Sequence, residues 1–356
     1  MKNIATLLVA ILFTAGMSFA QNNEATVTQN ANMSEASVTQ EGADNEALVT
    51  QQFGQYHEAQ VQQIGNSNET SLIQDNTNNF ADIKQLGDDN TAKIFQRSRL
   101  FVGPGNDAAS IELTQEGDDN AADIRQDAEA GLGGSMTNVL SALQQGNENY
   151  LFVDQNRDLG PGYNSADVKQ HGDDNSASVD QDGESNSVLI EQGVYGSSYN
   201  SIADFTQIGD GNYFETKQVR SFDNSVVGTQ EGDGNYYRVG LRGSDNDVTM
   251  NMLGDANRGS WSIGSLGWPH QPADNELSID VIGDGNYSTG SIKGDDNSVT
   301  IQQFGDGNRI GTSWYTTDGV DIAGNSNVVT IDQFSDFNSA SVSVTGSGNS
   351  STVLQN

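Results

Sequence analysis

The feature that most constrains this chain is a pattern of twelve residues, Gln-x-Gly-x-x-Asn-x-Ala-x-x-x-Gln, that recurs along it. The stretch from Gln40 to Gln51 (QEGADNEALVTQ) shows the pattern in full, and residues 85–96, 115–126 and 170–181 repeat it almost letter for letter. Taking the last residue as the end of a segment gives 27 segments, most of them eleven residues apart, of which 20 end in Gln. A fixed period of this kind predicts a repeat architecture.

Within each segment, the residue types alternate with a period of two. The residue six places before the end is Asn in 23 of the 27 segments, and apolar residues commonly stand four and two places before the end. In the stretch quoted above, Asn45, Ala47, Val49 and Gln51 therefore share one parity, while Glu46, Leu48 and Thr50 share the other. Strict alternation predicts a β-strand with one buried face. The four segments without the Asn have Ser34, His57, Ala109 and Ser201 in its place.

A short x-Gly-x-x linker separates one predicted strand from the next. Glycine allows a positive φ, and Asp or Asn can hydrogen-bond to the local backbone, so each linker predicts a tight turn. Strand, turn and strand in aligned copies predict an all-β fold, a β-solenoid with two strands per coil and about 13–14 coils, roughly 65 Å long at the usual strand spacing. The glycines predicted to form such turns include Gly42, Gly87, Gly117 and Gly172.

Stacking such coils places the recurring Asn and Gln residues in columns along the axis. Each side-chain amide can then hydrogen-bond to the equivalent amides above and below it, as in cross-β assemblies. This would let a polar chain form a core, because the buried amides satisfy one another. The inward residues predicted to form this self-assembly ladder are Asn45, Gln51, Asn68, Gln74, Asn79, Gln85, Asn90, Gln96, Asn120, Gln126, Asn175, Gln181, Asn349 and Gln355.

The first twenty residues are expected to lie outside the fold. A basic start at Met1-Lys2, an apolar run from Ile4 to Phe13 and a small-x-small site at 18–20 predict a secretory signal peptide at 1–20. An N-terminal anchor is the alternative. Residues 21–356 would form one continuous, exported repeat domain, and no other apolar run approaches the ~20 residues of a membrane-spanning helix.

Six gaps between segments exceed the regular spacing and predict loop insertions. All four prolines fall in these gaps, as expected because proline cannot donate a hydrogen bond to a strand ladder. In a two-strand coil, the first three insertions should project from one edge and the last three from the other. The insertions are expected near 97–108, 127–137, 156–163, 193–200, 264–274 and 315–326.

Composition restricts the classes of function. The formal net charge is -34, from 49 acidic and 15 basic residues, which argues against binding nucleic acid or an anionic membrane. The hydrophobic fraction of 34% is low enough to suggest disorder, but the regular repeat overrides that interpretation. There is no cysteine, so disulfides cannot stabilise an exported chain.

Few residues point to catalysis or to a cofactor. His57, His171 and His270 are scattered and lack metal-ligand spacing, so neither an enzyme nor a zinc site is expected. The Gly-Asp-Gly-Asn turns at 209–212, 232–235, 283–286 and 305–308 leave two interpretations open. They resemble calcium-binding turns of repeat β-rolls, or their charge slows premature assembly.

The repeated pattern resembles the curlin repeat, the unit of the bacterial curli amyloid subunits, over essentially the whole mature chain. The resemblance implies an extracellular functional amyloid fibre of the biofilm matrix, involved in adhesion. It also implies export through an outer-membrane pore and a nucleator subunit as partner. The competing hypothesis is a monomeric β-solenoid adhesin on the cell surface, with calcium bound at the acidic turns.

Three features depart from the familiar family pattern. The chain has many more repeats than the major subunits, and its first strand begins almost at the expected cleavage site, with no targeting segment between them. Several of the later segments end in an apolar residue instead of Gln, such as Leu241, Met252 and Trp314. The early half is therefore expected to be the amyloid-competent part. Neither end of the solenoid shows a capping element, which favours end-to-end stacking.

Overall fold

The computed structural model describes residues 22–100, 108–130, 137–155, 163–193, 198–264, 274–311 and 319–356. The expected signal peptide at 1–20 lies outside these ranges, as do large parts of the six insertions.

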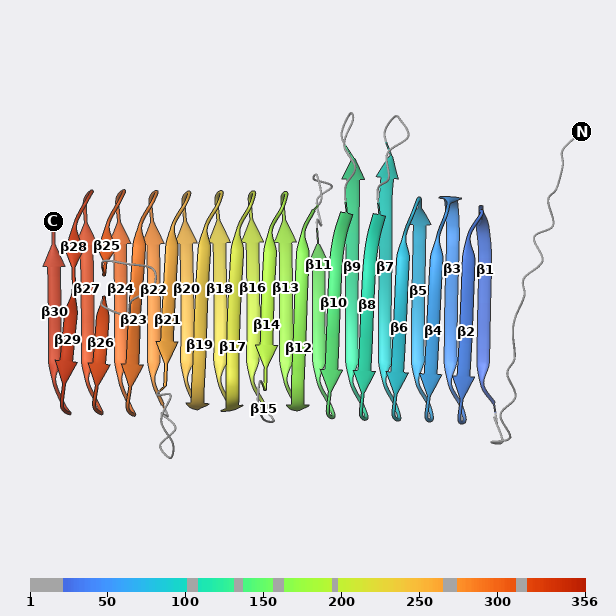
Figure 1. Cartoon of the computed structure of the whole chain (residues 1–356), viewed down its shortest axis with the longest axis horizontal. Helices are drawn as coiled ribbons and strands as arrows, with labels where there is room; N and C mark the ends of the chain where they lie inside the picture. Colours follow the sequence, from blue (N-terminus) through green and yellow to red (C-terminus); the bar gives the residue numbers. More distant parts are fainter. Residues whose placement is uncertain are drawn as a thin grey trace, which may run out of the picture.

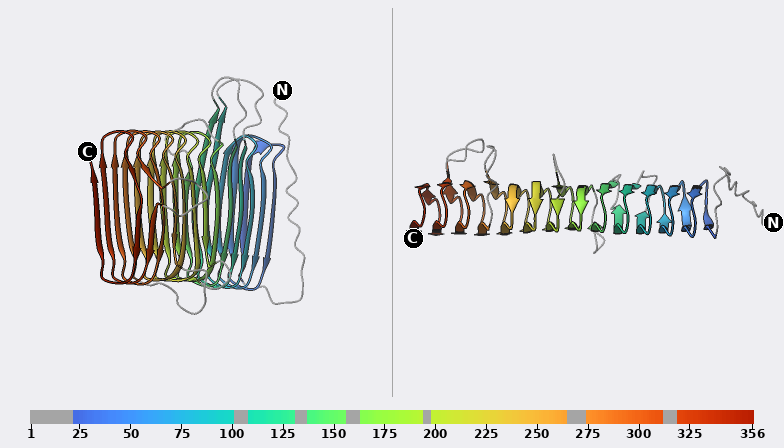
Figure 2. Two further views of the ribbon diagram at one scale, coloured as in Figure 1. Left: turned by 60° about the vertical axis from the view of Figure 1, so that its left-hand side comes forward. Right: turned by 90° about the horizontal axis from the view of Figure 1, so that it is seen from below.

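The described residues form strands and turns, arranged as two parallel sheets that lie face to face (Figures 1 and 2). The first sheet has 14 strands and the second has 16. The first sheet contains β1 (Glu24–Asn32), β3 (Glu46–Gln55), β5 (Glu69–Asn76), β7 (Thr91–Leu100), β9 (Ala121–Ala130), β11 (Tyr150–Gln155), β13 (Ser176–Asp182), β16 (Ile202–Ile208), β18 (Ser225–Glu231), β20 (Asp247–Leu253), β22 (Glu276–Ile282), β24 (Ser298–Phe304), β27 (Val328–Phe334) and β30 (Ser350–Gln355). The second contains β2 (Glu35–Glu41), β4 (Glu58–Ile64), β6 (Phe80–Leu86), β8 (Ala108–Glu116), β10 (Thr137–Gln145), β12 (Ser165–Asp173), β14 (Ser187–Gln192), β15 (Ser198–Tyr199), β17 (Tyr213–Phe222), β19 (Tyr236–Ser244), β21 (Arg258–Ile263), β23 (Tyr287–Lys293), β25 (Arg309–Ile310), β26 (Val320–Ala323), β28 (Ser339–Ala340) and β29 (Val342–Thr345).

Successive segments alternate between the two sheets, so each strand pairs with the strand one full coil away. The pairs are parallel and bring equivalent residues of the repeat opposite each other, as with Gln29, Gln51 and Gln74 along β1, β3 and β5. The predicted two-strand β-solenoid is confirmed. Strand pairing in this register is what places identical side chains in columns.

The number of strand positions in the two sheets agrees with the 27 segments predicted from the sequence. The first sheet has 14 strand positions, and the main path of the second has 13, because β14 with β15, β25 with β26 and β28 with β29 each share one position. One predicted segment end is wrong. Ile322, not Trp314, pairs with Ile292, because the last insertion interrupts its segment between β25 and β26 instead of following it.

The early and the late insertions follow strands of different sheets. The first three come after β7, β9 and β11 of the first sheet, whereas the last three come after β14, β21 and β25 of the second. Where the structure describes residues of the expected insertions, the insertions are shorter than expected, because strands extend into them. β7 continues to Leu100 and β9 to Ala130, β15 lies inside the expected loop at 193–200, and β26 lies inside the one at 315–326.

The turns have a more specific backbone than the sequence indicated. The predicted glycines have positive φ, for example +129° at Gly87, where the carbonyl oxygen of Gly117 occupies the space that a Cβ would need. The last residue of the x-Gly-x-x linker is also left-handed, with φ of 57° at Asp44 and Asp89. Asp and Gly are common there because they tolerate this region better than other residues.

The core lies between the sheets and changes character along the axis. In the first half, small and aliphatic residues such as Ala47 and Val49 are fully buried. Later coils bury aromatic residues, and glycines make room for them: a Cβ on Gly259 would meet the ring of Tyr237. Large and small residues thus complement each other in neighbouring coils, as close packing requires.

Candidate assembly site

Two columns of glutamine run through the interior, one along each sheet. In the first, the Nε2 amide of Gln51 donates to Oε1 of Gln74 (2.9 Å), and Gln74 donates in turn to Gln96 (3.0 Å). In the second, Gln63 donates to Gln85 (2.9 Å) and Gln85 to Gln115 (3.0 Å). Every bond of this kind points from the N-terminal coil to the C-terminal one, so each column has a direction.

Each glutamine amide also holds the turn next to it. Nε2 of Gln85 donates to the backbone carbonyl oxygens of Glu69 (3.1 Å) and Asn90 (3.0 Å). Side chain and backbone are therefore bound together where one sheet passes into the other. An amide with all its hydrogen-bonding groups used can be buried without the usual penalty for a polar group.

Asparagine forms a further column before the strands of each sheet, and its hydrogen bonds have the opposite direction. Nδ2 and the backbone N–H of Asn90 both donate to Oδ1 of Asn68, at 3.0 and 3.1 Å, and Asn68 makes the same contacts with Asn45. Nδ2 of Asn90 also donates to the carbonyl oxygen of Gly117 in the next coil (2.7 Å). An Asn in such a column thus joins three consecutive coils, which explains why Asn recurs before most of the strands.

The structure places most of the predicted ladder residues in the interior. Twelve of the fourteen are buried with an exposed fraction of at most 1%, namely Asn45, Gln51, Asn68, Gln74, Asn79, Gln85, Asn90, Gln96, Asn120, Gln126, Asn175 and Gln181. Asn349 is exposed and Gln355 is half-buried, because Gln355 belongs to β30, the last strand of the first sheet, and Asn349 directly precedes that strand.

One of these residues does not join a ladder as predicted. Asn79 has His57 one coil before it, and Ala109 occupies the equivalent position one coil after it, so the Asn column before the second-sheet strands is interrupted. Its Nδ2 instead donates to the carbonyl oxygen of Asp75 (2.8 Å), and its Oδ1 has no hydrogen-bond partner. Burial lowers the pKa of His57, whose Nε2 lies 3.0 Å from the carbonyl oxygen of Phe53.

The glutamine columns stop where apolar residues replace them. In the first sheet Met252 and Val281 fill two positions, and the column resumes with Gln303, Gln333 and Gln355. The restart leaves Oε1 of Gln303 buried without a partner, because the preceding coil has no amide to donate. Interruption of the ladder therefore leaves an unsatisfied group at its boundary.

The acidic turns stack as well. Oδ1 of Asp233 accepts the backbone N–H of Asp210, and Asp255 accepts that of Asp233, both at 2.8 Å. The contact continues through Asp284, Asp306 and Asp336. The carboxylates thus serve as connectors between turns. Among the residues that the structure describes, no group of three or more His, Asp or Glu side chains is arranged to hold a metal ion.

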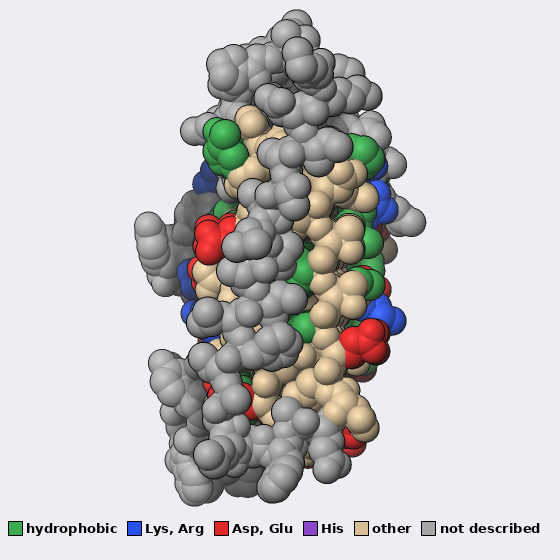
Figure 3. All heavy atoms as spheres, turned by 90° about the vertical axis from the view of Figure 1, so that its right-hand side faces the viewer, with side chains coloured by type: hydrophobic (Ala, Val, Ile, Leu, Met, Phe, Trp, Pro, Cys, Tyr) green, Lys and Arg blue, Asp and Glu red, His purple; other side chains and the backbone are tan. Residues whose placement is uncertain are grey.

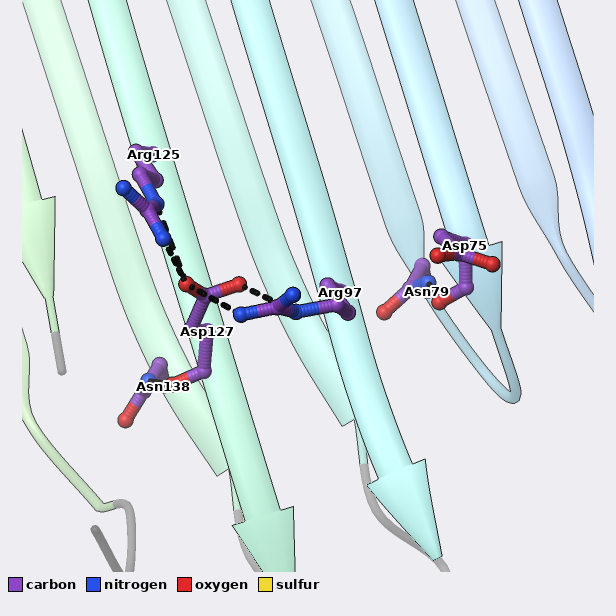
Figure 4. A network of polar contacts seen from close by, with 6 residues as sticks. All are labelled: Asp75, Asn79, Arg97, Arg125, Asp127 and Asn138. Carbon is purple, nitrogen blue, oxygen red and sulfur yellow. Dashed lines mark hydrogen bonds and ion pairs between the residues drawn. The ribbon is translucent and has the colours of Figure 1, made fainter. Parts of the chain in front are cut away.

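A buried ion cluster was not anticipated from the sequence, since its central pair, Arg97 and Asp127, falls within the expected insertions. Asp127, 1% exposed, accepts from Nε and Nη2 of Arg97 (both 2.9 Å) and from Nε of Arg125 (3.0 Å) (Figure 4). Its backbone carbonyl oxygen accepts from Asn138 (2.9 Å). In-register pairing of β7 and β9 places Arg97 beside Asp127, so the cluster secures two strands at the base of the first insertions.

The outermost strands have incomplete burial. Val27 and Val353, which occupy the buried aliphatic column, are only partly buried in β1 and β30. Seen from the N-terminal end, the described atoms are mostly backbone and uncharged polar groups, with few hydrophobic side chains (Figure 3). These strands present ladder groups at both ends of the first sheet.

Comparison with models of protein families gives a match. The family model described as the curlin associated repeat matches residues 34–65, 65–96, 164–197 and 324–356, which lie in both the early and the late part of the solenoid. A search of curated proteins gives no match. The residues that the structure describes include no helix that could span a membrane.

Proposed function

We propose that this chain, which belongs to the curlin-repeat family, is a structural subunit that assembles end to end into an extracellular amyloid-like fibre. Its role would be structural and not enzymatic, with self-association as the activity. The observation that carries the proposal is the set of amide ladders of the first sheet, which have complementary groups in its first and last strands.

The end groups define how two copies would meet. Where two Gln residues are neighbours in the first sheet, Nε2 of the earlier one donates to Oε1 of the later one. Gln355 therefore has a donor directed away from β27, and Gln29 has an acceptor directed away from β3. In the Asn ladder the roles are reversed, and Oδ1 of Asn349 would accept from Asn23 of the next molecule. Stacking β1 of one copy on β30 of another would continue both ladders with donor facing acceptor.

Family membership supports the remaining parts of the proposal. A curlin-type subunit would be exported, pass through an outer-membrane pore and polymerise at the cell surface on a nucleator subunit, contributing to biofilm matrix and adhesion. The expected signal peptide at 1–20 is consistent with export.

The test is assembly of the purified full chain, followed by thioflavin fluorescence and electron microscopy. Fibres should form, and seeds should shorten the lag. The variants Gln29→Leu and Gln355→Leu should slow elongation, because each removes one partner of the proposed junction while keeping the side-chain size. Gln60→Leu is the matched control, since Gln60 is exposed on β4 and faces away from the core. A chain that stays monomeric for days would instead favour a monomeric surface adhesin.

A further inference from the structure

The second half of the solenoid carries opposite charges on its two outer faces. From β16 onward, the outward side chains of the first sheet include six acidic residues and no basic one among those that the structure describes. Among the side chains that the structure describes, the outward ones of the second sheet include six basic and two acidic residues over the same coils. The acidic face consists of Asp204, Glu231, Asp247, Glu276, Asp280 and Asp332; the basic face carries Lys217, Arg238, Arg242, Arg258, Lys293 and Arg309, with Glu215 and Asp321.

This polarity is confined to the later coils. In the earlier coils, Lys93, Arg97 and Arg125 lie on strands of the first sheet, and Lys84 and Lys169 lie on strands of the second. Both early faces therefore mix the two signs. Because the chain as a whole is strongly acidic, a face with an excess of cations is an exception that calls for a physical explanation.

We propose that the basic face of β17–β21 docks on the acidic face of β18–β22 of a second copy of this chain, so that solenoids associate side by side. The partner is identified by charge complementarity, since the surface of opposite sign with matching strand spacing is the chain's own opposite face. This lateral contact is separate from the end-to-end junction and does not require it.

The cations of the basic face are held in place by an ion network. Glu215, 6% exposed, accepts from Nε of Arg238 (2.8 Å) and lies 3.5 Å from Nζ of Lys217, which also pairs with Glu191 (3.0 Å). Burial acts to raise the pKa of Glu215, but hydrogen bonds from Arg238 and Tyr213 outweigh it, and the pKa is lowered overall. The carboxylate thus stays charged and fixes two cations, while Arg242 and Arg258 add to the excess of positive charge.

An aromatic groove lies within the same face. Tyr213 and Tyr236 stack with ring centroids 4.8 Å apart, and together with Arg238, Arg258 and Ser260 they line a cavity of about 430 Å³. Tyrosine and arginine are the residue types enriched at the centres of protein interfaces. Beyond the groove, the outward residues Tyr287, Thr289 and Ser291 of β23 are already buried and only Lys293 is exposed. The most accessible part of the basic face is therefore the part formed by β17, β19 and β21.

The acidic face offers a flat counterpart. Asp247 and Glu276 lie opposite each other on β20 and β22 and are both exposed. The apolar side chains of Leu253 and Ile282, 37% and 43% exposed, continue the same two strands and would be covered by the docked copy. The turn carboxylates do not prevent this contact, because equivalent turns of two copies would be roughly 20 Å apart, beyond the Debye length of about 8 Å at physiological salt.

The experiment is small-angle X-ray scattering of the freshly purified full chain at low and high salt. Side-by-side pairing enlarges the cross-section, whereas end-to-end stacking enlarges only the length, so the two associations are distinguished. We expect a thickened cross-section at about 20 mM salt that returns to that of a single solenoid at about 0.5 M. The variants Asp247→Lys/Glu276→Lys and Arg242→Glu/Arg258→Glu should each lower the pairing constant at least about tenfold. Combining all four substitutions exchanges the charges at these positions of the two faces, so that opposite signs meet again, and should restore pairing.

Matched controls separate the facial contact from net charge. Glu46→Lys/Glu69→Lys changes the charge equally at the same strand position of early coils. Lys84→Glu/Lys93→Glu changes the charge by as much as Arg242→Glu/Arg258→Glu, on early strands outside the basic face. Both should pair like the native chain. The proposal is overturned if the controls lose pairing as the late variants do, if the quadruple variant is not rescued, or if the native chain stays single at low salt. A different result would assign the basic face to an anionic polymer instead. In that case the native chain would not pair but would bind added polyglutamate, and Arg242→Glu/Arg258→Glu would abolish this binding.

Discussion

Replacing Gln85 with Ala is the sharpest perturbation of the amide ladder, because this side chain is fully buried and all its partners are identified. Its Oε1 accepts from Gln63 (2.9 Å) and from the hydroxyl of Thr70 (2.9 Å), and its Nε2 donates to Gln115 (3.0 Å). Nε2 of Gln63 keeps three other acceptors, the carbonyl oxygens of Glu46 and Asn68 and the Thr70 hydroxyl. The substitution would therefore orphan two buried groups, Oε1 of Gln115 and the hydroxyl proton of Thr70.

The expected loss of stability follows from those two groups. A buried polar group left without its partner costs about 1–3 kcal/mol, so the pair costs about 2–6 kcal/mol, before any contribution from the cavity. We take about 4 kcal/mol for the local free energy of opening, which corresponds to roughly a thousandfold change in the opening equilibrium.

Native-state hydrogen exchange measures this quantity coil by coil. Amides of β4, β6 and β8 should exchange roughly a thousandfold faster in Gln85→Ala, while those of β19 to β27 should be unchanged, because each coil contacts only its neighbours. Lys93→Ala is the control: its side chain is exposed on β7, and the substitution should change exchange by less than threefold, within about 0.5 kcal/mol. A change of tenfold or less in Gln85→Ala would refute the idea that the ladder stabilises the core.

Three further predictions concern single positions. Gly259→Ala places a methyl group inside the ring of Tyr237 and should lower the free energy of unfolding, measured with urea, by at least about 2 kcal/mol. Gly87→Ala meets a backbone carbonyl at φ +129° and should destabilise more strongly than Gly211→Ala, where φ is +67° with open space and the loss should be about 1 kcal/mol; equal losses would contradict the steric explanation. Because burial lowers the pKa of His57 in the folded state, its contribution to stability is present above the unfolded pKa of about 6.5 and is lost as the pH falls below it. Urea unfolding across pH 5–7.5 should therefore show an acid-sensitive component that His57→Asn removes, and an unchanged pH profile in that variant would count against it.

The period of the sequence was enough to predict the fold, because a strand with one buried face and an eleven-residue repeat allows few other arrangements. The alternation at Asn45, Ala47, Val49 and Gln51 specified which side chains face inward, and the burial of these four residues confirms it. Gly42 and its equivalents identified the turns, as their positive φ shows.

Other features depend on which residues meet across coils, which a single segment does not reveal. The column is interrupted at Asn79 because its two neighbours along the column are His57 and Ala109. No side-chain amide is therefore available on either side. Trp314 was assigned to the end of a segment because it follows the regular spacing, whereas pairing with β23 selects Ile322. The ion cluster around Asp127 and the charged faces of the later coils likewise became visible only with the strand register.

The most direct test of the central claim is the cryo-electron microscopy structure of a fibre grown from the full chain. The ladder account predicts a filament whose core is one solenoid wide, with parallel strands perpendicular to the axis and the ~4.8 Å repeat continuing from β30 of one molecule to β1 of the next. A filament in which equivalent strands of many chains stack on one another, as in a steric zipper, would contradict it, because the solenoid would then not be the building block.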